Sequence, residues 1–508
     1  MTMETDRSLA ASQDLGLAQK PPMNKYALCC ALLASMTSVL LGYDIGVMSG
    51  AIIFIQEDLK LTDVEIEILA GILSVYSLVG SFAAGRTSDV IGRRYTIVVA
   101  GVFFLAGSLF MGFAASYTLL MMGRFIAGIG VGFGLMIAPC YTAELAPSSS
   151  RGLLTSLSEV FINVGILLGY VSNLAFSGLP LDLGWRIMLG IGVIPSLFII
   201  FGVLAMPESP RWLVLQGRIK DAKKVLGKTS ESEEEAASRL ADIKSAVGIP
   251  EDCDDDVVSV PKHQSNGSGV FKELLFKPTP SVRHIVIAVI GINFFQQSIG
   301  IDAVVLYSPR IFAKAGITSS GKQLLCTVGV GIMKTLFILV ATFTLDRIGR
   351  RPLLLSTIFA MFLSLFCLGT GLTVVDQVGD TATWAIGLSV VAVLAYVASF
   401  SVGMGPILWV YCSEILPLRL RAQGTGIGVA VNRLFSGTVS MTFLSLSKAL
   451  TIGGAFYLFA GISVVAWLFV FFLLPETRGR NLEDTERLFG DLSWKKKEKQ
   501  LASAKASI

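Results

Sequence analysis

The feature that most constrains this chain is a series of apolar segments, each about 20 residues long, separated by short charged or Pro/Gly-containing stretches. A helix of about 20 apolar residues crosses the hydrocarbon core of a bilayer, and lipid-exposed irregular backbone cannot, because its polar groups would lack partners. Hydrophobic residues make up 53% of the 508 residues and charged residues 15%. The sequence therefore predicts an all-α polytopic membrane protein with about twelve transmembrane helices.

These segments form two sets of six on either side of a long polar loop. The predicted spans are 26–49, 67–85, 96–115, 118–140, 153–176 and 186–206 in the first set, then 283–307, 323–345, 352–374, 383–411, 422–446 and 452–474. The predicted organisation is an N-terminal tail 1–25, a six-helix bundle 26–206, a loop 207–282 with short helices, a second six-helix bundle 283–474 and a C-terminal tail 475–508.

The two halves repeat each other in sequence. "YDIGVMSGAIIF" resembles "IDAVVLYSPRIF", which aligns Asp44 with Asp302, and "SDVIGRR" resembles "LDRIGRR". "CYTAELAPSSSRG" and "VYCSEILPLRLRAQG" follow in the same order and align Glu144 with Glu414. Transporters that work by rocking are built from such repeats, with the substrate site between them near the middle of the membrane. The repeat therefore favours a transporter.

The distribution of arginine predicts the orientation. The positive-inside rule assigns the Lys/Arg-rich loops to the cytoplasm, which places both termini and the 207–282 loop there. The first 25 residues are polar and lack the apolar core of a secretory signal. The arginines in question are Arg86, Arg93, Arg94, Arg151, Arg347, Arg350, Arg351, Arg419 and Arg421.

Several functional classes are not supported by the residue content. A net charge of +4 is too small for a chain of this length to indicate nucleic-acid binding. The seven cysteines show neither a disulfide framework nor metal-ligand spacing. No nucleophile–base arrangement or phosphate-binding loop is recognisable, so we expect neither an enzyme nor a bound metal.

Six motifs carry a family resemblance that extends from about residue 26 to 485: "GRTSDVIGRR", "GRFIAGIGVG", "PESPRWL", "QQSIGID", "DRIGRRPLL" and "PETRGRNLED". Together they resemble the sugar porters of the major facilitator superfamily. "GIDAVVLYSPRIF" and "VNRLFSG" are most similar to the plant polyol/monosaccharide transporters. The resemblance implies the MFS fold, a plasma-membrane location, a monomer in the lipid bilayer, substrates among sugar alcohols, hexoses and pentoses, and protons as coupling ion without any cofactor.

The seventh predicted span contains the polar groups that a sugar site requires. A polyhydroxyl substrate needs amides or carboxylates that pair with its hydroxyls and an aromatic plane for its C–H face. Gln296, Gln297 and Asp302 lie in "FFQQSIGID", where Gly300 could let the helix unwind around a cavity.

The resemblance adds further substrate-binding candidates. Gln296, Gln297, Trp409 and Asn432 match sugar-binding positions of the family, with Trp409 as the aromatic floor and Tyr307 near the outer gate. An alternative is that the Gln and Trp side chains only join helices to one another.

Four charged residues depart from the commoner family pattern. Glu159, Asp302 and Lys334 stand where many hexose carriers have amides, and Arg433 follows Asn432. We hypothesise that Lys334 and Arg433 neutralise the two acids across the cavity and bind polyols through charge-assisted hydrogen bonds. The alternative is a static ion pair that fixes packing and never contacts substrate.

Asp44 lies inside the first apolar segment, where a carboxylate is unfavourable. The resemblance pairs it with Arg124 as the proton-coupling site. A change in their separation would alter the proton affinity of Asp44. The alternative is a purely structural salt bridge. His263 and His284 are the chain's only histidines and lie in the loop and at a span edge, so carboxylates are the expected proton carriers.

Charged motifs at the cytoplasmic ends of the helices predict a gate. Partly exposed ion pairs are weak individually, but a network formed in one conformation can shift a balanced equilibrium. The predicted gate residues are Asp89, Arg93, Glu144, Arg151, Glu208, Arg211, Asp346, Arg350, Glu414, Arg421, Glu476 and Arg480.

The predicted function is a proton-coupled symporter that imports polyols and monosaccharides by alternating access. Two alternatives stay open: a proton-independent facilitator of the same substrates, and a sensor that binds sugar but transports little. Dependence on a proton gradient separates the first two, and counterflow in liposomes separates both from a sensor.

Overall fold

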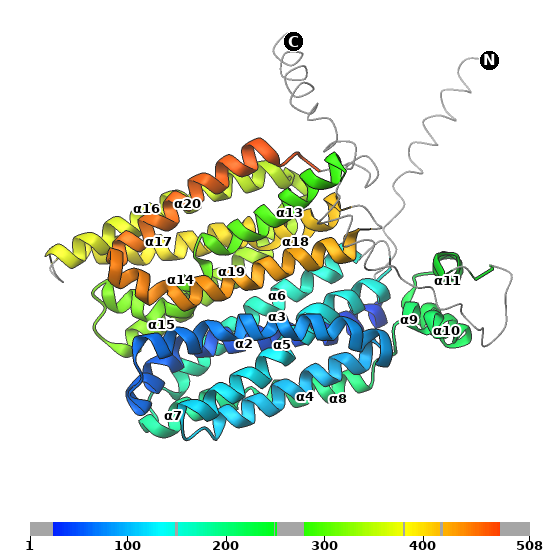
Figure 1. The fold of residues 1–508 in the computed structure, drawn as a ribbon, viewed down its shortest axis with the longest axis horizontal. Coiled ribbons are helices and arrows are strands. Elements are labelled where there is room, and N and C mark those ends of the chain that lie inside the picture. The colour runs from blue at the N-terminus through cyan, green and yellow to red at the C-terminus, as the bar shows by residue number, and fades with distance from the viewer. Residues whose placement is uncertain are drawn as a thin grey trace, which may run out of the picture.

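The computed structural model describes residues 24–147, 151–247, 249–250, 279–378, 382–416 and 420–477. The described residues form helices and no strand, and 12 helical segments are long and apolar enough to cross a membrane. Figure 1 shows two helical bundles lying one above the other, the first half of the chain below and the second half above. The predicted all-α fold is therefore confirmed.

The first bundle consists of α2 (Lys25–Leu59), α3 (Asp63–Ile91), α4 (Arg93–Gly112), α5 (Tyr117–Leu145), α6 (Arg151–Phe176), α7 (Leu181–Gly190) and α8 (Val193–Leu204). The second consists of α13 (Pro280–Ser298), α14 (Ile301–Lys314), α15 (Ser320–Ile348), α16 (Arg350–Val378), α17 (Thr383–Val402), α18 (Met404–Ile415), α19 (Arg421–Leu450) and α20 (Ile452–Leu473). Between the bundles lie α9 (Pro210–Leu215), α10 (Ile219–Thr229) and α11 (Glu233–Val247).

Three predicted spans are each broken into two helices, which corrects the continuous segments expected at 186–206, 283–307 and 383–411. The breaks lie between α7 and α8, between α13 and α14, and at Gly403 between α17 and α18. Gly300 has φ +93°, a left-handed conformation that glycine adopts without steric cost. The helix is interrupted between Ser298 and Ile301, which is the unwinding expected at Gly300. A Cβ at Gly300 would also lie 2.7 Å from the ring of Phe459.

The two bundles meet where small residues let helices approach closely. On α3, a Cβ built at Gly71 would lie 2.8 Å from the carbonyl oxygen of Gly437 on α19. On α15, a Cβ at Gly331 would lie 2.8 Å from the ring of Tyr170 on α6. Such close approach favours helix association inside membranes. The pairs α3–α19 and α6–α15 thus pack closely across the boundary between the two bundles.

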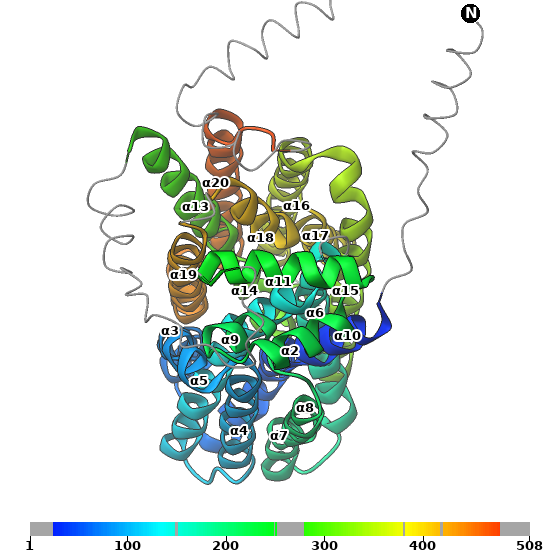
Figure 2. The same ribbon diagram turned by 90° about the vertical axis from the view of Figure 1, so that its right-hand side faces the viewer.

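The helices α9, α10 and α11 lie at one end of the bundles, which we call the loop-helix end (Figure 2). Ser232 caps α11 by accepting a hydrogen bond from the Glu235 N–H at 3.1 Å. Arg239 of α11 donates to the carbonyl oxygens of Glu144 and Leu145 at 3.1 and 3.2 Å, which ties α11 to the end of α5. The short helices expected in the loop are therefore present.

Candidate functional site

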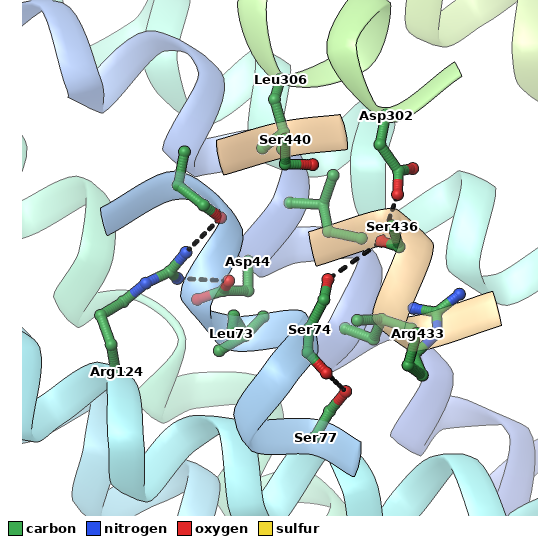
Figure 3. Close-up of a pocket in the computed structure, with 13 residues that line it drawn as sticks. Asp44, Leu73, Ser74, Ser77, Arg124, Asp302, Leu306, Arg433, Ser436 and Ser440 are labelled. Carbon is green, nitrogen blue, oxygen red and sulfur yellow. Dashed lines mark hydrogen bonds and ion pairs between the residues drawn. The ribbon is translucent and has the colours of Figure 1, made fainter. Parts of the chain in front are cut away.

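Asp44 and Arg124 form a buried ion pair inside the first bundle (Figure 3). The Nη1 of Arg124 lies 2.5 Å from the Oδ2 of Asp44, and their side chains are 1% and 2% exposed. Arg124 also donates to the carbonyl oxygens of Leu69 at 3.2 Å and Ala70 at 3.4 Å. The structure thus brings together the two residues that the sequence paired, with α2, α3 and α5 all contributing.

Three amide side chains of the second bundle form a hydrogen-bonded cluster next to the break between α13 and α14. Gln297 donates to the Oδ1 of Asn432 at 3.1 Å, and Asn432 donates to the Oε1 of Gln296 at 2.5 Å. Gln296 in turn donates to the Met404 carbonyl oxygen at 2.8 Å. Arg433 donates to the same Oδ1 of Asn432 at 2.6 Å. The amide cluster joins α13, α18 and α19.

One acceptor of the amide cluster is unsatisfied. Gln297 is only 5% exposed, and its Oε1 has no hydrogen-bond partner. Most buried polar atoms in proteins are paired, so a lone buried acceptor in a polar cluster requires an explanation. A ligand hydroxyl that donates to this oxygen would satisfy it. Sequence reasoning selected Gln297 but could not identify the atom left unpaired.

The four unusual charges lie at one polar centre without direct ion pairs. Glu159 interacts electrostatically with Lys334 and Arg433, and Trp409 lies beside it. Asp302 interacts with the same two cations. Within the described part of the chain, no pair of these four charges approaches to 4 Å. The direct static ion pair considered from the sequence is therefore not formed.

A small cavity separates the ion pair from Asp302. Its volume is about 10 Å³, room for roughly one water molecule. Its polar lining is contributed by both bundles, as Figure 3 shows. The polar residues are Asp44, Ser74, Ser77, Arg124, Asp302, Arg433, Ser436 and Ser440.

Tyr307 lies on the face of α14 that contacts α19. Its side chain is 1% exposed, donates to the Ser440 carbonyl oxygen at 2.8 Å and stacks on Phe443 at 5.3 Å between ring centroids. The backbone at Tyr307 is non-helical, with φ −108° and ψ 15°, and Pro309 follows. A kink beside a packed aromatic pair is a suitable place for a gate.

A polar network joins the bundles at the end opposite the loop helices, and we call it the opposite-end network. The Nζ of Lys448 lies 2.5 Å from the Oδ2 of Asp63, and Arg310 lies 3.7 Å from the same carboxylate. Arg310 also donates to Gln56 at 2.5 Å, and Glu67 accepts from the N–H and hydroxyl of Ser445 at 2.7 and 2.5 Å.

Sequence reasoning did not identify the opposite-end network. The segment "QEDLKLTDVEIE" is acidic, and Arg310 lies in the repeat "IDAVVLYSPRIF". The charges therefore gave a signal, but the partners are more than 200 positions apart in the chain, as with Gln56 and Arg310. Nothing in their spacing indicated which would pair.

At the loop-helix end, Glu208 joins two helix starts of the first bundle. Its Oε1 accepts from the N–H groups of Arg93 at 2.9 Å, Arg94 at 3.1 Å and Ser209 at 2.8 Å. Gly92 has φ +93°, and a Cβ there would lie 2.4 Å from the Glu208 carboxylate. Burial raises the pKa of Glu208 above its ordinary value, and these N–H groups oppose that shift.

Arg93 joins the neighbouring acids of the same bundle. It lies 3.2 Å from Asp89 and 3.3 Å from Glu144, and Glu144 also accepts a hydrogen bond from the Ser209 hydroxyl. Asp89, Arg93 and Glu144, three of the predicted gate residues, are therefore in contact, with Arg93 as the partner of Glu144. Arg211, by contrast, is exposed and forms no ion pair with Glu144 or Glu208.

The second bundle repeats this arrangement. Glu476 accepts from the N–H groups of Arg350 and Arg351 at 3.1 and 3.0 Å, and Gly349 has φ +102°. Arg350 lies 2.8 Å from Glu414, which also accepts from the Thr477 hydroxyl at 2.6 Å. The side chains of four further predicted gate residues lie outside the described residues: Arg151, Asp346, Arg421 and Arg480.

The comparisons with known proteins agree with this geometry. The pattern of the family described as "Sugar (and other) transporter" matches residues 30–489, and the chain belongs to that family. The chain is 63% identical over 500 residues to "Putative polyol transporter 1" of Arabidopsis thaliana, covering 97% of this chain and 98% of that protein. It is also 63% identical to "Polyol transporter 5" of the same plant, covering 94% and 89%.

The structural comparison identifies the same architecture. The proton:xylose symporter XylE of E. coli, a major facilitator superfamily protein, matches with a TM-score of 0.75 and 28% identity, covering 92% of this chain and 100% of that one. The predicted MFS fold and sugar-porter family are confirmed. Since the family consists of transporters, the prediction that the chain is not an enzyme is confirmed as well.

Proposed function

We propose that this protein is a proton-coupled symporter that imports polyols and monosaccharides by alternating access. The single observation that carries the proposal is the unpartnered Oε1 of Gln297 in a buried amide cluster. A polyhydroxyl substrate supplies O–H donors and acceptors on successive carbons, which matches a site made of amides. Relatives named polyol transporters and a structural neighbour named a proton:xylose symporter support the same substrate class.

The substrate site combines neutral and charged groups. The amide cluster binds successive hydroxyls, while Trp409 provides an apolar plane beside Glu159. Lys334 and Asp302 form no direct ion pair, and the hydrogen bond from Ser436 occupies only the Oδ2 of Asp302, so we assign the Lys334 ammonium and the Asp302 Oδ1 to the substrate. Hydrogen bonds to such charges are roughly twice as strong as neutral ones. This arrangement suits flexible linear polyols, whose ordering on binding has to be offset.

Proton coupling is assigned to the Asp44–Arg124 pair. In this conformation Asp44 is paired with Arg124 at 2.5 Å, and we assign it to the state after proton release. Separation of the pair in the other conformation favours protonation, because an isolated charge inside the membrane is unfavourable. A proton and a substrate that stabilise the same state raise each other's affinity for it.

The conformation described here is assigned as inward-facing. The opposite-end network joins the two bundles at the end away from the loop helices, through Asp63 with Lys448 and Arg310 and through Glu67 with Ser445. The described ion pairs at the loop-helix end, Arg93–Glu144 and Arg350–Glu414, join residues of the same bundle. In line with the arginine distribution, we assign the loop-helix end and both termini to the cytoplasm. On the family resemblance, we propose a monomer in the plasma membrane.

The test of this function is uptake of labelled sorbitol and glucose into proteoliposomes, with and without an inward proton gradient. We expect accumulation above the equilibrium level only with the gradient. Uptake that is equal with and without the gradient would indicate a facilitator instead. Absence of counterflow, with specific binding retained, would indicate a sensor.

Breaking the opposite-end network is expected to shift the protein toward an outward-open state. Asp63→Asn removes the carboxylate that Lys448 and Arg310 share. Each partly exposed pair contributes about 0–1 kcal/mol, so a few-fold change in population is expected. The measurement is the rate at which an impermeant thiol reagent labels Leu306→Cys from outside, in a background whose native cysteines are replaced.

The matched control is Asp221→Asn, which breaks the exposed Arg218–Asp221 pair of 2.5 Å on a loop helix. This change should leave the labelling rate unaltered. An unchanged rate in Asp63→Asn would show that the network does not hold the gate closed.

A further inference from the structure

Two serine hydroxyls form a bridge between the bundles beside the cavity. The Oγ atoms of Ser74 on α3 and Ser436 on α19 lie 3.0 Å apart. Ser436 is 3% exposed and its hydroxyl donates to the Oδ2 of Asp302 on α14. Since that hydroxyl proton is given to Asp302, Ser74 must be the donor to Ser436. Figure 3 shows this chain, which we call the serine bridge, running from one bundle to the other.

The serine bridge ends at a carboxylate that shares the cavity with the Asp44–Arg124 pair. The charged residues that line the cavity are Asp44 from α2, Arg124 from α5, Asp302 from α14 and Arg433 from α19, while α3 contributes only Ser74, Ser77 and apolar residues. Lys334 also interacts electrostatically with Asp302. With all of these groups ionised, each of the two aspartates has at least one cation nearby.

Protonation of Asp44 changes this balance. The negative charge beside Arg124 disappears, while Arg124 remains bound to the carbonyl oxygens of Leu69 and Ala70. Asp302 is then the one ionised carboxylate among the residues that line the cavity. In a medium of low polarity such a change in charge acts over several ångströms. The orientation of the Asp302 carboxylate therefore decides how strongly protonation of Asp44 changes the electrostatic force on α14.

We propose that Ser74 and Ser436 are positioning residues that couple the proton site to the substrate site. By fixing the Asp302 carboxylate against the cavity, the serine bridge makes the first turn of α14, next to the amide cluster, sensitive to the charge of Asp44. Ser74 belongs to the bundle that holds the proton site, so movement of the bundles apart breaks the bridge. This inference rests on the proposed proton symport and assigns its transmission to particular residues.

The test uses the full-length protein in proteoliposomes and measures three quantities: the substrate accumulation ratio under a proton gradient, the number of protons taken up per sorbitol, and gradient-independent counterflow. The variants are Ser74→Ala, Ser436→Ala and the double variant. Ser74→Thr keeps a hydroxyl at position 74, the more accessible of the two serines, and so tests whether the hydroxyl itself is what matters. Ser401→Ala is the matched control, because the buried Ser401 hydroxyl binds only the Val397 carbonyl oxygen of its own helix at 2.8 Å.

We expect the accumulation ratio and the proton stoichiometry to fall about five-fold or more in each alanine variant, the lower end of typical couplings between sites. Counterflow should stay close to wild type, and Ser74→Thr should restore coupling. The double variant should resemble the single ones, because either change breaks the same bridge. Ser74→Ala by itself decides the question if Ser436→Ala does not fold.

Unchanged accumulation and stoichiometry in the alanine variants, with a gradient response in wild type, would overturn the serine bridge while leaving symport intact. Parallel loss of counterflow and coupling, without recovery in Ser74→Thr, would reduce the serines to a structural role and also overturn it. A wild type without any gradient response would overturn both the bridge and the proposed symport.

Discussion

Asp44→Asn is expected to abolish accumulation driven by a proton gradient while counterflow of the substrate continues. The amide cannot be protonated and deprotonated, so the variant keeps one charge state through the transport cycle. Uptake should then approach the equilibrium level whatever the gradient. The measurement is the accumulation ratio of labelled sorbitol at several external pH values, whose pH dependence should disappear in the variant.

The same substitution should lower stability, because Arg124 loses its counter-ion while 1% exposed. Removing one partner of a buried ion pair typically costs about 3–5 kcal/mol, and the remaining amide oxygen reduces that loss. The melting temperature of the purified protein should therefore fall, and substrate binding should be checked at a temperature well below it.

Asp58→Asn is a suitable control for Asp44→Asn. Asp58 lies on the same helix, α2, and accepts from Trp185 at 2.9 Å and from Arg186 at 3.4 Å. Its loss should also lower stability but should leave the accumulation ratio unchanged. If Asp44→Asn still accumulates substrate against a gradient, another residue carries the proton.

The fold was predictable because the bilayer imposes it. Segments of about 20 apolar residues have few alternatives in lipid, and the matched motifs around Asp44 and Asp302 indicated the repeat. The pairing of Asp44 with Arg124 was available from family resemblance, and the structure places their atoms 2.5 Å apart. The sequence alone would have shown only that each buried charge needs a partner.

Other features depend on tertiary contacts and could not be predicted. The segment Gly403–Pro406 contains two glycines and a proline, which favour a helix break, but the exact position depends on tertiary packing. A Cβ at Gly403 would lie 1.9 Å from the Thr357 hydroxyl of α16, a neighbour that only the fold provides. The separation of Lys334 from Glu159 and Asp302 depends on how α6, α14 and α15 pack. The hydrogen bond between Ser74 and Ser436 joins residues 362 positions apart.

Asn432→Ala is expected to weaken substrate binding strongly. Asn432 occupies the centre of the amide cluster, where it bonds Gln296, Gln297 and Arg433. Neutral hydrogen bonds contribute about 0.5–1.5 kcal/mol each, and those to charged groups about 1.5–3 kcal/mol. Without Asn432 both glutamines also lose the partner that orients them toward the substrate. The KM of counterflow should therefore rise about 10- to 100-fold, which corresponds to a loss of roughly 1.4–2.8 kcal/mol of binding free energy.

Asn173→Ala is the control that separates substrate binding by Asn432 from the loss of a hydrogen bond that only joins two helices. Asn173 is fully buried in the first bundle and donates to the Gly46 carbonyl oxygen at 3.0 Å, away from the amide cluster. Both substitutions should lower the melting temperature, because each removes a buried hydrogen bond. Only Asn432→Ala should raise KM. Equal KM values in the two variants, with both less stable, would mean that the amide cluster joins α13 to α19 and that the hydroxyl groups of the substrate bind elsewhere.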